Sequence, residues 1–219
     1  MTAPSQSRPD RHMFTRFPRT LRALVLMVSL MWLIPLHGVH SALATPTSHL
    51  TAASSLQRVT LNVTEVDRFF GKQANAPWHL APGTSGSGLA TAVEQRQGRV
   101  RGSGRTFVRS HAGSPGRDYV ESAVGQFTTA AKAHALLLGL ASKATAPVTS
   151  IQGLGNEALL VQAGPSYFVL FRRGVYGGLV GAASLKSVDA RGAVSYAKID
   201  VHHLQAAAQW MDARLMGGK

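Results

Sequence analysis

The stretch EALLVQAGPSYFVLFRRGVYGGLVGAASLK, residues 157–186, decides the fold. It contains three short runs rich in apolar, β-branched and aromatic residues, separated by Gly164-Pro165 and by Gly174. Runs of this length, joined by tight turns that contain glycine, predict consecutive strands that pair antiparallel. The sequence therefore predicts an antiparallel sheet at the centre of the protein.

Two further strands are predicted upstream, at residues 99–109 and 119–127, where residues suited to strands precede and follow a loop rich in glycine. Short turns join the strands, and the helical patterns are set apart from them in sequence. That order predicts an α+β fold. We expect an antiparallel β-sheet of about five strands, with two or three helices packed mainly on one face.

Helices are predicted in three places by apolar residues at helical spacing, namely residues 56–70, 128–142 and 200–215. The last of these has the clearest signals, because an aspartate can cap it and a narrow apolar stripe runs along it. Residues 74–88 are rich in proline and glycine and predict a long loop that contains Trp78.

Two motifs resemble a pattern found in bacterial exported proteins and lipoproteins of unknown function. They are the Gly-Leu-Gly-Asn-Glu-Ala turn at residues 153–158 and the Phe-Arg-Arg-Gly corner at residues 171–174, followed by a terminal amphipathic helix. The resemblance covers residues 119–215 and implies an exported α+β domain. Its motifs are structural, so it implies no active-site residues. The chain departs from the lipoprotein members because it has no cysteine to carry a lipid.

The first 44 residues have the three parts of a secretory signal peptide. Five arginines precede an apolar run at residues 23–36, and Ala42 and Ala44 place small residues where signal peptidase requires them. The apolar run is shorter than the roughly 20 residues that a transmembrane helix needs. We expect cleavage after Ala44 and export to the extracellular or cell-envelope space; an uncleaved N-terminal anchor is the alternative.

Cleavage at this point would leave residues 45–55 as a flexible leader and residues 56–219 as a single domain. The whole chain has 23 Lys and Arg against 10 Asp and Glu, and the part after Ala44 keeps 18 basic and 9 acidic side chains. A basic domain outside the cytoplasm is predicted to meet anionic envelope polymers or lipid headgroups rather than nucleic acid. Contact with the membrane is expected only through the signal segment or peripherally.

Local motifs for catalysis and for cofactors are missing from the sequence. There is no cysteine, no pair of histidines at four-residue helical spacing and no Gly-x-Ser-x-Gly nucleophile elbow. We therefore expect no catalytic residue, no cofactor and no metal, and a binding domain rather than an enzyme. Two alternatives stay open. One is a secreted hydrolase whose catalytic residues meet only in the fold, and the other is a small-molecule sensor domain with a cavity near Trp78 or Trp210.

The stretch QGRVRGSGRTFVRSHAGSPGRD, residues 97–118, is the candidate binding site. Side chains alternate along a strand, so four of its arginines share one face unless a bulge at Gly-Ser-Gly breaks the alternation. The planar guanidinium group binds phosphate, sulfate and carboxylate. A solvated strand face is the alternative. The predicted anion-binding residues are Arg99, Arg101, Arg105, Arg109 and Arg117.

Overall fold

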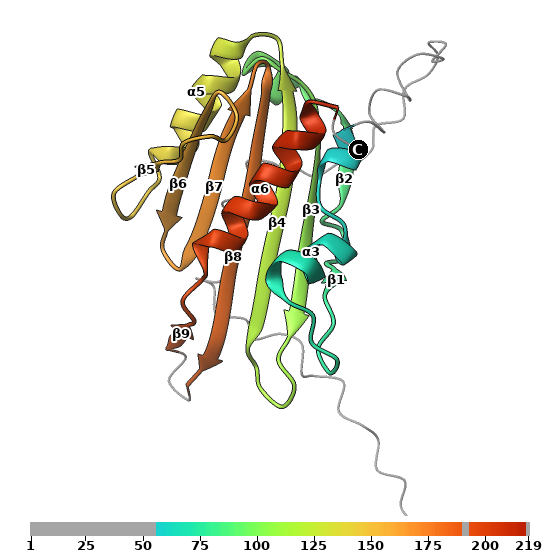
Figure 1. The fold of residues 1–219 in the computed structure, drawn as a ribbon, viewed down its shortest axis with the longest axis vertical. Helices are drawn as coiled ribbons and strands as arrows, with labels where there is room; N and C mark the ends of the chain where they lie inside the picture. Colours follow the sequence, from blue (N-terminus) through green and yellow to red (C-terminus); the bar gives the residue numbers. More distant parts are fainter. Residues whose placement is uncertain (1–55, 190–192, 218–219) are drawn as a thin grey trace, which may run out of the picture. The chain divides into compact units, whose positions relative to one another are not determined.

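The structure is a computed structural model, and it describes residues 56–189 and 193–217. The predicted signal peptide, its cleavage residues Ala42 and Ala44, and the leader at residues 45–55 lie outside this part. The described residues form one antiparallel sheet of nine strands (Figure 1). Its main strand order is β1 (His79–Leu80), β3 (Arg99–Ser110), β4 (Arg117–Phe127), β8 (Tyr176–Val188), β7 (Ser166–Arg173), β6 (Glu157–Ala163) and β5 (Thr149–Ser150).

Two more strands pair beside this order: β2 (Gly86–Leu89) with β3, and β9 (Val194–Tyr196) with β8. The antiparallel α+β prediction holds in outline, and the five predicted strands are β3, β4, β6, β7 and β8. The sheet is larger than the predicted five strands. The additional strands have two to four residues each, which is too short for an alternating pattern to stand out in sequence.

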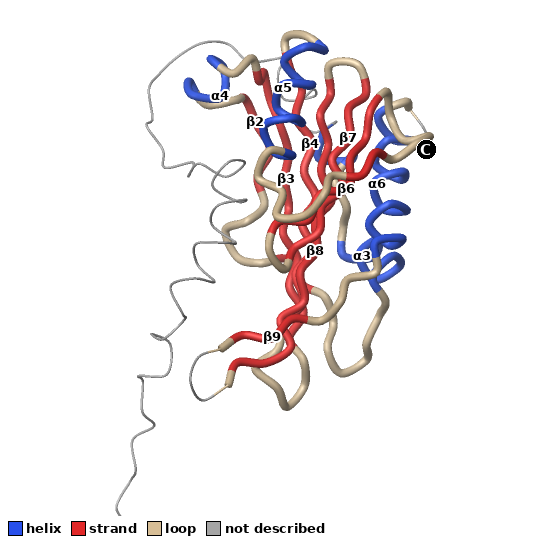
Figure 2. Tube along the Cα trace, turned by 90° about the vertical axis from the view of Figure 1, so that its left-hand side faces the viewer, coloured by secondary structure: helices blue, strands red, loops and turns tan. Residues whose placement is uncertain are grey.

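Helices α3 (Val63–Phe70), α4 (Ala92–Arg96), α5 (Ala130–Ala141) and α6 (Val201–Leu215) accompany the described sheet, and residues 56–59 are helical as well. Figure 2 shows α3 and α6 on one face of the sheet and α4 and α5 on the other. The prediction that helices pack mainly on one face is therefore wrong. The central strands β4 and β8 are buried on both faces, which requires helices on both. No helix of the described part combines the length and apolar character needed to cross a bilayer.

The predicted helix caps explain where the helices begin. Asp200 caps α6 by accepting a hydrogen bond from the backbone N–H of His202 at 2.9 Å, and Thr129 caps α5. The first predicted helix is interrupted: residues 56–59 are helical, and Asn62 and Glu65 form a capping box that starts α3 at Val63. Gly71 follows the end of α3 with a positive φ of 82°.

The main core lies between the sheet and the pair formed by α3 and α6. Strand side chains of one face meet helix side chains there, and these residues are almost fully buried. Prominent members are Phe107, Val120, Val124, Val169, Phe171 and Val180 from the sheet and Val66, Leu204, Ala208 and Met211 from the helices. At one end of this core, near the start of α6 and the end of α3, the layers separate and leave a pocket.

Candidate functional site

Three of the four arginines of β3 share one face, namely Arg101, Arg105 and Arg109, whereas Arg99 lies on the other. Arg99 pairs with Phe127 of β4 and Arg101 pairs with Gln126, so Val100 is an extra residue that forms a bulge. Neighbouring residues of β4 point to opposite faces, and Arg99 and Arg101 therefore do so as well. The Gly-Ser-Gly segment, where the sequence indicated a bulge, pairs regularly.

Each arginine of this strand contacts protein groups. Arg99 forms an ion pair with Glu94 of α4, and the Arg101 side chain donates to the Gln126 amide oxygen at 2.6 Å. Arg105 donates to the carbonyl of Leu61 at 2.9 Å. Arg109 is only 7% exposed, and Arg117 is half-buried at the start of β4. Arg101, Arg105 and Arg109 thus form a row of three on one face, and Arg99 and Arg117 lie on the opposite face.

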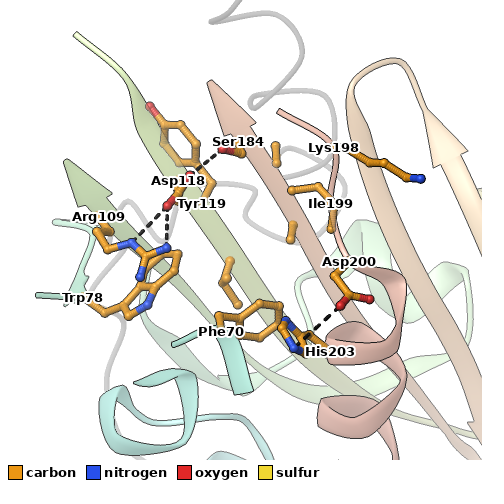
Figure 3. Close-up of a pocket in the computed structure, with 13 residues that line it drawn as sticks. Phe70, Trp78, Arg109, Asp118, Tyr119, Ser184, Lys198, Ile199, Asp200 and His203 are labelled. Atoms are coloured by element: carbon orange, nitrogen blue, oxygen red, sulfur yellow. Dashed lines mark hydrogen bonds and ion pairs between the residues drawn. The ribbon is translucent and has the colours of Figure 1, made fainter. Parts of the chain in front are cut away.

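A pocket of about 200 Å³ lies beside Arg109, between the ends of β3, β4 and β8 and the segment that enters α6 (Figure 3). Val120 and Ala182 form its apolar floor, and Phe70 and Trp78 bring aromatic rings to its sides. This is the cavity near Trp78 that the sensor alternative required. Trp210 does not line it: its indole N–H donates instead to Glu65, at 3.2 Å.

Asp118 organises the polar side of the pocket. Its Oδ2 accepts hydrogen bonds from Nε and NH2 of Arg109 at 2.9 and 2.6 Å. Its Oδ1 accepts from Ser184 Oγ at 2.5 Å and lies 3.0 Å from Nε2 of His111. These four contacts occupy both lone pairs of each carboxylate oxygen. The carboxylate is held by residues of two neighbouring strands, β3 and β8, and of the loop after β3.

Arg109 connects this carboxylate to the wall of the pocket. Its guanidinium carbon lies 4.4 Å from the centre of the Trp78 ring, a cation–π distance. Arg109 NH1 and the Trp78 indole both donate to the carbonyl of Gly71, at 2.8 and 3.2 Å. The end of α3 is thereby attached to β3, and Trp78, at 4% exposure, is fixed in place although it lies in the predicted long loop.

The opposite side of the pocket is formed by the start of α6 and the segment before it. His203 meets the Phe70 ring edge-on, with ring centres 6.3 Å apart, and its Nε2 lies 3.8 Å from a carboxylate oxygen of Asp200. Lys198 and Ile199 complete this rim. Figure 3 shows the Lys198 side chain at the edge of the pocket, with its ammonium turned outward.

The arrangement around Ser184 does not match a serine hydrolase. In a triad, a histidine accepts the serine proton and a carboxylate orients that histidine. Here Ser184 donates directly to Asp118, and no hydrogen bond among the described residues joins Ser184 to a histidine. Burial alone would raise the pKa of Asp118, but hydrogen bonds from Ser184, Arg109 and His111 and the charge of Arg109 lower it. A carboxylate so stabilised is a weak base.

Histidine and carboxylate side chains form no candidate metal site in residues 56–189 and 193–217, where no three of them converge as ligands of one ion. The sensor alternative named a cavity near Trp78 or Trp210, but the sequence did not connect Asp118, Ser184 and the rim of α6. In the sequence these residues stand out merely as polar residues in or beside apolar runs. Strand pairing is needed to bring them together.

The fold and pocket define an antiparallel α+β domain with a small concave site. No family model and no curated protein matches the chain. Among solved structures, the chain is similar to the extracellular domain of PknH from Mycobacterium tuberculosis, with 16% sequence identity and a TM-score of 0.42. That match covers 81% of this chain and 100% of the other. At this level of similarity, function has to be argued from the residues of the chain itself.

Proposed function

We propose that the protein is an exported binding domain that holds a small ligand in the pocket beside Trp78, without catalysis. The observation that carries this proposal is a pocket with an apolar floor and a fixed polar wall. Small-molecule sites are typically concave, with apolar lining and a few positioned polar groups. The cavity volume of about 200 Å³ fits a ligand slightly larger than benzene, which a cavity of about 150 Å³ can hold.

Filling the floor of the pocket tests this function. In ¹⁵N NMR titrations with hexanol, we expect saturable shifts centred on the amides of Val120, Ala182 and Ile199. Ala182→Leu places a larger side chain in the pocket, and we expect it to weaken hexanol binding at least tenfold. Overpacking costs about 1–3 kcal/mol, so the unfolding midpoint of the variant is measured as well.

Ala163→Leu is the matched control, because Ala163 lies at the end of β6 and does not line the pocket. It should leave the hexanol affinity unchanged. Ile199→Trp blocks the pocket from its half-buried rim and provides a second variant if Ala182→Leu folds poorly. Hexanol shifts that do not saturate, or that survive both pocket variants, would refute the proposal.

Hydrolysis is the competing function, and Ser184 is the residue to examine. We expect no turnover of p-nitrophenyl acetate above the rate of a Ser184→Ala variant, because the serine donates to Asp118, whose lowered pKa makes it a weak base. A rate that falls by more than tenfold in Ser184→Ala would identify an enzyme instead.

Export is part of the proposal and rests on the sequence of residues 1–44. Ala44→Asp puts a charged side chain where signal peptidase requires a small residue. We expect this variant to accumulate as the 219-residue precursor, whereas the unchanged protein is recovered with Thr45 at its N-terminus. Mass spectrometry of the exported protein measures the difference; an intact N-terminus in the unchanged protein would favour the anchor.

The binding of anionic envelope polymers or lipids by Arg99, Arg101, Arg105, Arg109 and Arg117 stays a prediction. The bulge at Val100 and the internal contacts of these side chains make their strand a less suitable site than the pocket.

A further inference from the structure

The charged side chains that line the pocket differ in whether they already have a hydrogen-bond or ion-pair partner. The Asp118 carboxylate, at the inner side, is saturated by Arg109, Ser184 and His111. The Asp200 carboxylate, at the rim, accepts a hydrogen bond from the backbone N–H of His202 and lies near His203. Each lining carboxylate therefore already has partners of its own.

Lys198 is the exception among the charged lining groups. It is exposed, and within the described part of the chain it has no hydrogen bond or ion pair. Its ammonium lies at the rim on a flexible four-carbon stem, so rotation about that stem can bring it over the opening. The start of α6 lies at the same rim, where the Asp200 carboxylate caps it. Among the described lining groups, Lys198 is therefore the charged side chain that remains available to a ligand.

The interior of the pocket is suited to hydrocarbon. Val120 and Ala182 on the floor are 1% and 6% exposed, and the half-buried Phe70 and Ile199 border the space above them. Arg109 directs its Nε, NH1 and NH2 donors to Asp118 and Gly71, so it is poorly placed to bind a second anion there. An apolar group fits inside, and a charged group fits only at the rim.

We propose that the ligand is a small monoanionic amphiphile, with its hydrocarbon end on Val120 and Ala182 and its carboxylate at the rim beside Lys198 and His203. This inference rests on the ligand-binding function proposed above and adds the chemical class. The part of the chain after Ala44 keeps 18 basic against 9 acidic side chains, and this excess of positive charge favours the approach of such an anion.

Three probes of equal chain length test the class: hexanoate, hexanol and hexylamine, titrated at pH 7 against the exported protein and the full chain by ¹⁵N NMR. We expect hexanoate to bind three- to fivefold more tightly than hexanol, the size expected of one exposed ion pair, and hexylamine to bind least. Lys198→Gln should remove the advantage of hexanoate and leave the hexanol affinity unchanged. Lys132→Gln, on α5 at the opposite face, should leave all three affinities unchanged.

The outcomes separate the two proposals. If none of the probes shifts the amides of Val120 and Ala182, the ligand-binding function itself fails. If hexanol binds at the pocket and hexanoate binds no more tightly, or hexylamine binds best, the pocket is a ligand site and the anionic class is wrong. If hexanoate still binds more tightly than hexanol in Lys198→Gln, the proposed place of the carboxylate beside Lys198 is wrong.

Discussion

Glu121→Gln will remove the loss of stability that the burial of Glu121 is expected to cause between pH 5 and pH 8. Glu121 lies on β4, on the face opposite the pocket, and has no hydrogen bond or ion pair with the described residues. Its strand neighbours in the same row are Thr106 and Gly181. The Phe168 ring covers Gly181, where a Cβ would lie 2.5 Å from a ring carbon. Burial raises the pKa of Glu121 from 4.5 to about 7.

The direction of the pH effect follows from that pKa. Between pH 4.5 and 7 the folded protein keeps the Glu121 proton while the unfolded chain releases it, so the free energy of unfolding falls as pH rises. Well above pH 7 both states are ionised and the contribution is constant. From pH 5 to pH 8 the loss from this one group is about 2.5 kcal/mol.

Urea unfolding at a series of pH values measures this slope. Glu157→Gln makes the same chemical change on β6, where burial opposes ionisation but hydrogen bonds and charges from His134 and Arg172 lower the pKa of Glu157. That control should lose stability above pH 5, whereas Glu121→Gln should gain it at pH 8. Identical slopes for Glu121→Gln and the unchanged protein would show that Glu121 does not titrate near neutrality.

Arg109→Gln will destabilise the protein by about 3 kcal/mol, the lower end of the range for breaking a buried ion pair. The substitution leaves the Asp118 carboxylate without its cation and the Gly71 carbonyl without one of its donors. It also removes the cation that stacks on Trp78. The side chains of Arg109 and Asp118 are 9% and 13% exposed, so water replaces these contacts poorly.

Arg101→Gln is the matched control on the same strand, because Arg101 is half-buried and pairs with the neutral Gln126. We expect it to cost less than about 1 kcal/mol in the same urea unfolding experiment. Equal losses for the two variants would contradict the central role of the Arg109–Asp118 pair. Any test of polymer binding through these arginines should therefore keep Arg109, since its removal perturbs the fold as well as the charge.

Much of the fold could be predicted because it depends on local patterns. The runs that became β6, β7 and β8 are separated by turn residues, and Thr129 and Asp200 place side-chain oxygens where helix N-termini need acceptors. These signals act within a few residues of sequence. The short strands β1, β2, β5 and β9 lack them, and they form because a longer neighbour offers backbone partners.

The sequence by itself determined that β3 is a strand rich in arginine, and it left open whether a cavity lies near Trp78 or near Trp210. Tertiary structure decided where those side chains point. The bulge at Val100 sends Arg99 to the opposite face, and the pairing of β3, β4 and β8 brings Arg109, Asp118 and Ser184 together. Strand register depends on hydrogen bonds between segments distant in sequence, and a shift of one residue reverses every face. The local pattern therefore specifies the elements, while the pocket exists only through their register.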